Sequence, residues 1–324
     1  MSDNWMENTY GQSSEYIGEY IGNPYIDSNF MAGMLNRYRE NSIRIKRNGA
    51  WHTISVLLTC NRKKIIITTD TKSNIETHYD IIMDVLRFEN IFEGNFYPVI
   101  SFKMDEVEYI EKLRQYQLAY FDSQKRYTYF PIDLNDIEYR KLFYSWKRLQ
   151  KQVKIIHPVF LYSTYLDGMP VDVRMALLLE TFEPMAEYLY NKGIIQLQHP
   201  PMITYSNKCK KCGTLVKRTV PNKKLTFADR IKPLIKVYGK EIFKGENKQR
   251  LVTKAVNVRN KVDHVNANTV KVMSGKECGF YLAKFSLMYR IILFDQMGIE
   301  LSKIMPVVTK WVDEYNRTFS QLRI

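Results

Sequence analysis

The chain has 324 residues, of which 45% are hydrophobic, and its formal net charge is +14. This length favours two domains with cores of ordinary size. No apolar run reaches the roughly 18 residues that a membrane-spanning helix needs, and the polar, acidic start is unlike a secretory signal. The four cysteines are too few for a disulfide framework in a chain of this length. We therefore expect a protein of the reducing cytoplasm that has no membrane partner.

The charge is unevenly distributed along the chain. Residues 1–30 hold five acidic residues and no lysine or arginine, whereas residues 208–261 hold seventeen basic residues and three acidic ones. That segment alone equals the net charge of the whole chain, which predicts a polyanionic partner, with nucleic acid as the first candidate. A solvated cationic face that maintains solubility is the alternative. A membrane surface is disfavoured, because no basic amphipathic stretch has a broad aromatic face.

The N-terminal half has the patterns of an α+β domain with an antiparallel sheet. Residues 1–30 lack any hydrophobic period and predict an acidic, loosely ordered segment, and residues 31–160 predict the folded domain. The clearest signal is Asn48-Gly49, a hairpin turn between two alternating stretches. The expected elements are strands over 41–47, 51–60 and 65–69, a helix over 78–92, an edge strand over 97–102, a hairpin over 117–132 and a helix over 136–154.

The C-terminal half has helical periodicity throughout. Residues 156–170 combine two prolines, a glycine and several aromatics, and they predict the domain boundary. Residues 165–324 predict an all-α domain, a four- or five-helix bundle, in which Pro184 kinks or breaks the first helix. The expected helices are 171–192, 225–243, 247–263, 273–296 and 299–320, with a long connection over 193–224.

One short stretch of the helical half has the residues for RNA cleavage. Leu251, Ala255, Val258 and Val262 form one apolar helical face, and the same helix carries Arg259-Asn260 and His264. A guanidinium can hold a phosphate by two hydrogen bonds, and an imidazole titrates near neutral pH and can move the proton of a 2′-hydroxyl. Five residues turn a helix by about 140° net, so either the helix ends before the histidine or the two residues act from different places in an assembled site. By spacing alone, a surface arginine and a helix-end histidine are the favoured explanation of the pair.

The run Arg259-Asn260-x3-His264 on the third helix of an all-helical domain resembles the motif of HEPN ribonucleases. Residues 171–192 (VDVRMALLLETFEPMAEYLYNK) resemble the first helix of the ApeA-like branch of that family. Residues 225–243 resemble its second helix, and residues 273–297 resemble the long helix that follows the motif. Upstream, residues 78–104 and the helix of Trp146 resemble the end of the N-terminal domain of that branch, although here this domain is short.

The resemblance implies a homodimer, or a higher homo-oligomer, in which two Arg259/His264 pairs form one composite site. His264 would act as general acid or base, Arg259 would stabilise charge on the phosphate and Asn260 would orient the substrate or the histidine. No cofactor is implied. Asp263 is the only carboxylate near the motif in sequence, too few for a pair of magnesium ions, so the 2′-hydroxyl would be the nucleophile. The resemblance also implies abortive defence against phage, with a phage-derived trigger acting on the N-terminal domain.

The basic segment supplies the residues that we expect to bind RNA. These are Lys208, Lys210, Lys211, Lys217, Arg218, Lys254 and Lys261. Cys209 and Cys212, in a Cys-x2-Cys-Gly turn, form half of a zinc knuckle, but no second such pair exists, so we expect reduced cysteines and no bound metal. Two other functions stay open: a HEPN-like module that binds RNA without cutting it, and a nucleic-acid-binding regulator stabilised by zinc at these cysteines.

Overall fold

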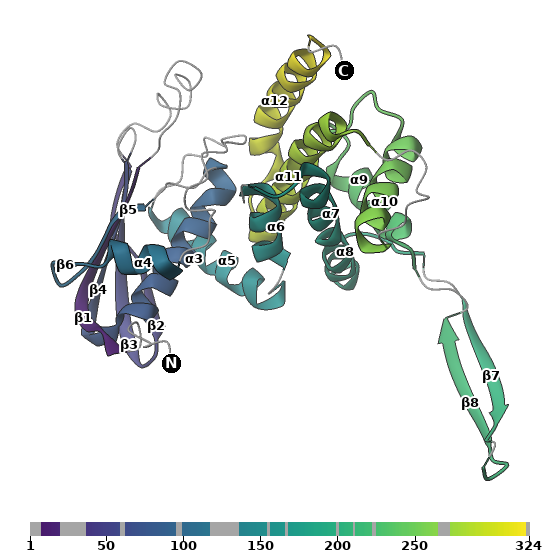
Figure 1. Cartoon of the computed structure of the whole chain (residues 1–324), viewed down its shortest axis with the longest axis horizontal. Helices are drawn as coiled ribbons and strands as arrows, with labels where there is room; N and C mark the ends of the chain where they lie inside the picture. Colours follow the sequence, from purple (N-terminus) through teal and green to yellow (C-terminus); the bar gives the residue numbers. More distant parts are fainter. Residues whose placement is uncertain are drawn as a thin grey trace. The chain divides into compact units, whose positions relative to one another are not determined.

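The structure, a computed structural model, describes residues 8–19, 37–58, 62–94, 99–116, 136–153, 156–165, 168–198, 201–209, 211–221, 225–264 and 273–321. Within the chain two compact units can be distinguished (Figure 1). The first comprises residues 1–154, 164–169 and 290–314, and the second comprises residues 155–163, 170–289 and 315–324. The sequence-based domain limits of 31–160 and 165–324 stay a prediction. None of the helices in the described ranges is both long and apolar enough to cross a membrane.

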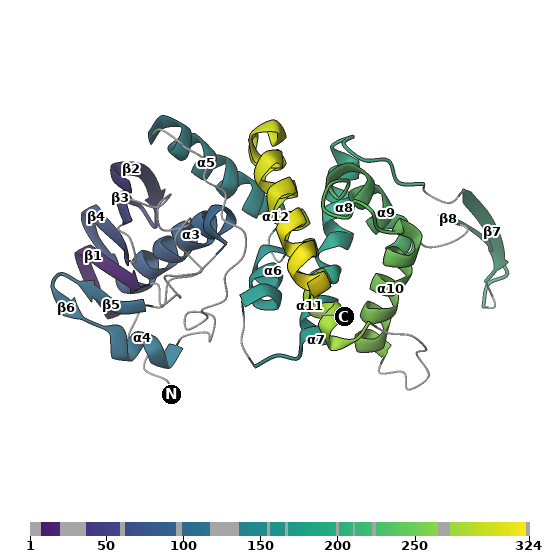
Figure 2. The same cartoon turned by 90° about the horizontal axis from the view of Figure 1, so that it is seen from above.

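The first unit is built on an antiparallel sheet with the strand order β2-β3-β4-β1-β5-β6. Helix α3 lies along one face of this sheet (Figure 2), and that face buries the apolar side chains Ile54, Ile65 and Ile67. The α+β class predicted from the sequence is therefore confirmed. The strands are β1 (Tyr10–Glu19), β2 (Arg37–Arg47), β3 (Ala50–Leu58), β4 (Arg62–Asn74), β5 (Val99–Met104) and β6 (Val107–Glu108), and the helices are α3 (Ile75–Glu93), α4 (Ile110–Tyr116) and α5 (Asp136–Gln152).

The predicted hairpin turn is present between β2 and β3. Asn48 and Gly49 both have positive φ, 49° and 88°, which is the conformation of a type I′ turn and explains why this dipeptide is favoured there. The helix predicted over 78–92 is α3, and the helix predicted over 136–154 is α5. The predicted hairpin over 117–132 lies outside the described residues.

Strand β1 contradicts the prediction of loose order for the N-terminal segment. It lies between β4 and β5, and it pairs with both in antiparallel register. Its inward-facing positions include Ser14 and Tyr16, which are 3% and 0% exposed. Ser14 Oγ lies 2.8 Å from Nδ1 of the buried His78 on α3. Buried and more exposed residues alternate along β1, as expected for a half-buried strand. Several of its buried positions hold glycine or serine, so the alternation of apolar residues that predicts such a strand is missing from the sequence.

One further prediction of this region needs correction. The strand predicted at a sheet edge, β5, pairs with β1 on one side and with the two-residue β6 on the other. The stretch 156–170, predicted as a domain boundary, contains helix α6 (Ile156–Tyr165), and the limits between the two units at residues 163/164 and 169/170 fall inside it.

The second unit is helical, as predicted. Helix α10 packs against α7 and α9, and α8 packs against α9. The single helix predicted over 171–192 is broken at Thr181, and Pro184 falls in the first turn of the second piece, where proline is tolerated. The helices are α7 (Val171–Glu180), α8 (Phe182–Asn191), α9 (Phe227–Tyr238) and α10 (Lys248–His264), while α11 (Gly275–Met297) and α12 (Leu301–Gln321) contribute residues to both units.

The connection predicted over 193–224 contains a two-stranded ribbon. Strands β7 (Met202–Lys208) and β8 (Leu215–Pro221) pair in antiparallel register, and Figure 1 shows them joined by a short turn. Nearly every residue of the ribbon is exposed. The sequence did not predict these strands because neither face is buried, so the apolar alternation that identifies a half-buried strand is weak.

A buried lysine forms ion pairs in the interior of the first unit. Lys63 of β4 is 1% exposed, and its Nζ lies 2.5 Å from Oε2 of Glu93 and pairs also with Glu89. The hydroxyl of Tyr139 on α5 donates a hydrogen bond of 2.7 Å to Glu89 Oε1. One ammonium group therefore balances two buried carboxylates of α3 beneath the sheet.

We predict that Lys63→Ala lowers the free energy of unfolding by about 3–5 kcal/mol, because it leaves two buried carboxylates without their cation. The neighbouring Lys64 pairs with Glu15 at the surface, with side chains 34% and 28% exposed. Lys64→Ala is therefore the matched control, and a change below about 1 kcal/mol is expected. Urea unfolding monitored by circular dichroism measures both. Equal losses for the two variants would contradict the structural role of Lys63.

Candidate functional site

Helix α10 is positioned by the apolar face that the sequence predicted. Leu251, Ala255 and Val258 are 2%, 0% and 0% exposed. Their burial fixes the rotation of the helix about its axis. The helical backbone continues through the whole predicted motif and ends at His264. The side chain of Val262 lies outside the described part.

The guanidinium of Arg259 is held by two carboxylates. Its Nε pairs with Oε1 of Glu180, and its Nη2 lies 3.2 Å from Oε2 of Glu180 and 3.1 Å from Oε1 of Glu183. Glu180 is the last residue of α7 and Glu183 is in the first turn of α8, and both acids lie beside one arginine. The Cζ atom of Arg259 also lies 5.4 Å from the centre of the Phe227 ring. The arginine is thereby fixed in one orientation.

This arrangement corrects one premise of the sequence analysis. Asp263 was the only carboxylate expected near the motif, yet Glu180 and Glu183 lie directly against Arg259. The helix break and the spacing of three residues between the two glutamates were visible in the sequence. Their contact with Arg259, 79 residues from Glu180, follows only from the packing of α7 on α10.

A pocket of about 530 Å³ opens beside the arginine. This volume lies within the range of about 300–1,000 Å³ that is usual for ligand pockets. Two of the three predicted catalytic residues, Arg259 and Asn260, line it together. The other lining residues come from α8, from α9 with the segment before it, and from α10: Glu183, Leu225, Thr226, Phe227, Ala228, Arg230 and Val256.

The opposite wall of this pocket is anchored at the start of α9. Thr226 caps that helix and exchanges hydrogen bonds with Asp229 in a capping box, which satisfies free amide groups of the first turn. Arg230 donates from Nε to Glu187 Oε1 at 3.0 Å and from Nη1 to the Leu225 carbonyl at 2.6 Å. The pocket therefore presents two arginines, and each is held by a carboxylate from α7 or α8.

The third predicted catalytic residue, His264, is placed by its backbone alone. It is the last residue of α10, so the helix does not end before it, and the side chain is outside the described part. Within one straight helix, Arg259 and His264 differ by about 140° in direction. The two residues therefore belong to different faces of α10. This favours the possibility that they act from different places in an assembled site.

The predicted RNA-binding residues fall into two groups in the structure. Lys208, Lys211, Lys217 and Arg218 belong to the exposed ribbon and its turn. Lys254 lies on α10, where its Nζ is 2.5 Å from Oε1 of Glu277. Lys261 also belongs to α10, but its side chain is not described, and Lys210 lies outside the described residues.

The two faces of the ribbon carry different basic residues. Residues that pair directly across the two strands share a face. Lys208 and Lys217 therefore lie on one face with Leu215, whereas Arg218 lies on the other, opposite Tyr205. Each face also carries exposed apolar side chains, Met202 and Leu215 on the first and Val216 and Val220 on the second. Both faces of the ribbon thus combine basic and apolar residues.

Cys209 and Cys212 lie in the turn of the ribbon. The Cys209 amide donates to the Thr214 carbonyl at 2.8 Å, and Gly213 adopts a φ of 72°, which favours glycine. Hydrogen bonds from Thr214, and then from Cys209, lower the pKa of the Cys212 thiol to about 7. No group of three or more potential metal ligands gathers anywhere among the described residues.

Comparison with known proteins identifies the helical region. Residues 201–303 match the family model described as Apea-like HEPN, which covers the ribbon, α9, α10 and α11. Residues 201–303 are therefore similar to an ApeA-like HEPN domain, as the resemblance predicted for this region. Since HEPN domains are generally ribonucleases, the match supports an RNA-related, nuclease-type function.

The match is narrower than the resemblance inferred from the sequence. It begins at residue 201, so the likeness of residues 78–104 and 171–192 to the ApeA-like branch stays a prediction. No curated protein and no solved structure matches the chain.

We predict that Cys212 reacts with iodoacetamide far faster than the buried Cys278 in the native protein, with a rate that rises to half its maximum at about pH 7. The thiolate is the reactive form, so the lowered pKa raises the rate at neutral pH. Thr214→Val removes a hydrogen bond to the sulfur and should move the midpoint of the pH profile upward. Peptide mass spectrometry after timed quenching measures each site separately. An unchanged profile in Thr214→Val would contradict this assignment.

Proposed function

We propose that the protein is a metal-independent endoribonuclease that acts as a homodimer. The observation that carries the proposal is the pocket in which Arg259 and Asn260 meet on α10 of an ApeA-like HEPN domain. Arg259 is 21% exposed at its side chain, so it is both fixed by carboxylates and accessible from the pocket. A prepositioned cation of this kind stabilises charge that develops on a phosphate without reorganising during the reaction.

In the proposed mechanism, His264 of one copy of the chain removes the proton from the 2′-hydroxyl, and His264 of the other copy delivers a proton to the leaving 5′-oxygen. Arg259 stabilises the negative charge on the phosphate, and Asn260 orients the substrate or the histidine. The products are a 2′,3′-cyclic phosphate and a 5′-hydroxyl. Because Arg259 and His264 occupy different faces of α10, two copies of the chain assemble the site across their interface.

The biological setting proposed for this activity is abortive defence against phage. In this proposal a phage-derived component acts on the sheet-containing N-terminal unit and releases RNA cleavage by the HEPN domain. The basic ribbon residues Lys208, Lys217 and Arg218, which are exposed, contribute affinity for RNA, and the motif contributes the chemistry.

A non-catalytic RNA-binding module is the second candidate, and one observation favours it. The ion pairs of Arg259 with Glu180 and Glu183 also suit an arginine whose role is to tie α7 and α8 to α10. The two functions differ in whether purified protein cuts RNA and in whether cutting depends on His264.

The decisive experiment compares wild type with His264→Ala on a defined RNA. General acid–base catalysis contributes about 10²–10⁴-fold, so His264→Ala should lower the cleavage rate by about that factor while RNA binding stays nearly intact. Arg259→Lys should also be strongly impaired, because lysine retains the charge but loses the two-pronged geometry. Gln249→Ala, an exposed change on the same helix, is the control and should retain activity.

The same experiment tests the choice of nucleophile. EDTA should not inhibit cleavage, and a 2′-deoxy substitution at the scissile nucleotide should abolish it. Magnesium-dependent cleavage of the 2′-deoxy substrate would overturn the mechanism and would make Glu180 and Glu183 the first residues to test as metal ligands. If no RNA is cut by wild type, the binding module becomes the better assignment.

A separate prediction concerns the carboxylates that hold Arg259. Glu180→Gln should lower kcat by about tenfold to a hundredfold, because a displaced catalytic group loses much of its effect, whereas the free energy of unfolding should change by less than about 1 kcal/mol. Glu187→Gln is the control, because it breaks the ion pair with Arg230. The side chains of Arg230 and Glu187 are 20% and 37% exposed, similar to those of Arg259 and Glu180, and kcat should stay unchanged. Steady-state kinetics with urea unfolding separates the two effects. A loss of stability that accounts for the loss of activity would reduce Glu180 to a structural role.

A further inference from the structure

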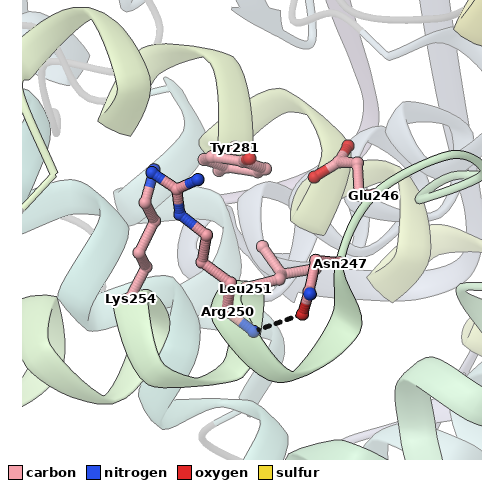
Figure 3. A pocket seen from close by; sticks show the side chains of 6 residues that line it. All are labelled: Glu246, Asn247, Arg250, Leu251, Lys254 and Tyr281. Atoms are coloured by element: carbon pink, nitrogen blue, oxygen red, sulfur yellow. Dashed lines mark hydrogen bonds between the residues drawn. The ribbon is translucent and has the colours of Figure 1, made fainter.

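A second hollow lies on the other side of α10. Its volume is about 250 Å³, and Figure 3 shows the side chains that surround it. They come from the first half of α10, from the two residues before it and from α11, and none of them lines the pocket of Arg259: Glu246, Asn247, Arg250, Leu251, Lys254 and Tyr281. Asn247 accepts a hydrogen bond of 2.9 Å from the Arg250 amide, which fixes the start of the helix.

The charges around this hollow leave one cation in excess. The carboxylate of Glu246 pairs with Lys284, which is 1% exposed, and the carboxylate of Glu277 pairs with Lys254 at 2.5 Å. Glu277 is itself held in place, since it exchanges hydrogen bonds with Ser274 at the start of α11. Arg250 is exposed and forms no ion pair with any residue of the described ranges. The hollow is therefore suited to an anion.

Tyr281 supplies a surface of a different kind. Its side chain is half-buried, and burial, together with the nearby Glu246 carboxylate, raises the pKa of its hydroxyl. Figure 3 shows the side chains of Arg250 and Lys254 extending from α10 toward Tyr281. Two cations beside an aromatic ring suit a nucleotide, whose phosphate binds cations and whose base stacks on rings.

The position of the hollow along α10 connects it to the motif. Arg250, Lys254, Asn257, Lys261 and His264 follow one another at intervals of four, three, four and three residues, which places the five positions on one helical face. Fourteen residues separate the first from the last, so they lie about 21 Å apart along the axis. This is the length of roughly six stacked nucleotides at about 3.4 Å each.

We infer that the hollow of Arg250, Lys254 and Tyr281 is a subsite for single-stranded RNA, which binds one nucleotide of the strand several nucleotides away from the bond that is cut. The inference rests on the proposed function for the location of that bond at His264. It adds a substrate contact outside the catalytic motif, and it gives the enzyme a preference for substrates long enough to reach from one end of α10 to the other.

Binding to the His264→Ala protein tests the subsite without cleavage. Fluorescence anisotropy with a labelled twelve-nucleotide RNA should show that Arg250→Ala weakens binding by about tenfold, as expected for loss of a charged hydrogen bond. The slope of log K against log salt should fall by about 0.7, the value for one phosphate contact to a single strand. Lys248→Ala is the matched control, since it removes the same charge from the same turn without lining the hollow, and it should weaken binding less than about twofold.

Substrate length tests the distance to the motif. In the otherwise native enzyme, Arg250→Ala should raise the KM for a twelve-nucleotide RNA by a factor that is about ten times the factor for a tetranucleotide. The kcat for each substrate should stay similar to that of wild type. If Arg250→Ala behaves like Lys248→Ala in both assays, or if the His264→Ala protein binds no RNA, the subsite is refuted. If wild type cuts no RNA but Arg250→Ala selectively weakens binding, the subsite stands and the proposed nuclease function fails.

Discussion

The contact of Arg259 with Glu180 and Glu183 is the constraint on which the candidate site depends. It joins three helices at one guanidinium. The two glutamates are three residues apart, a spacing that keeps two helical positions on nearly one face, and Thr181 between α7 and α8 has a φ of −64° and a ψ of −23°, which are close to helical values. Glu183 at the start of α8 also forms part of the wall of the pocket next to the arginine.

The basic segment of the sequence does not form a single basic surface. Part of it lies on the ribbon, where Lys208 and Lys217 share a face, and part lies on α10. Within α10, the charge of Arg259 is balanced by carboxylates while Arg250 remains exposed. Among the described residues of α10, the exposed and unpaired positive charge therefore lies away from Arg259. In the proposed enzyme, attraction of RNA and stabilisation of the reacting phosphate are consequently tasks of different residues.

The parts of the fold that the sequence predicted are those with strong local signals. Asn48-Gly49 predicted its turn because few dipeptides accept two positive φ angles. Leu251, Ala255 and Val258 predicted which face of α10 is buried. The sequence did not predict β7, β8 or the partners of Arg259. The ribbon has little buried surface and so no strong pattern, and Glu180 meets Arg259 only through packing across 79 residues of chain.

The missed strand β1 has a consequence for synthesis of the protein. Its two neighbours, β4 and β5, begin at residues 62 and 99, so β1 leaves the ribosome long before either partner exists. An exposed strand that waits for its partners is a site of aggregation when it is apolar and uncharged. Residues 10–19 contain two serines, two glutamates and two glycines, a composition that resists such association. The polar residues that prevented prediction of this strand from the sequence are thus suited to preventing its aggregation on the nascent chain.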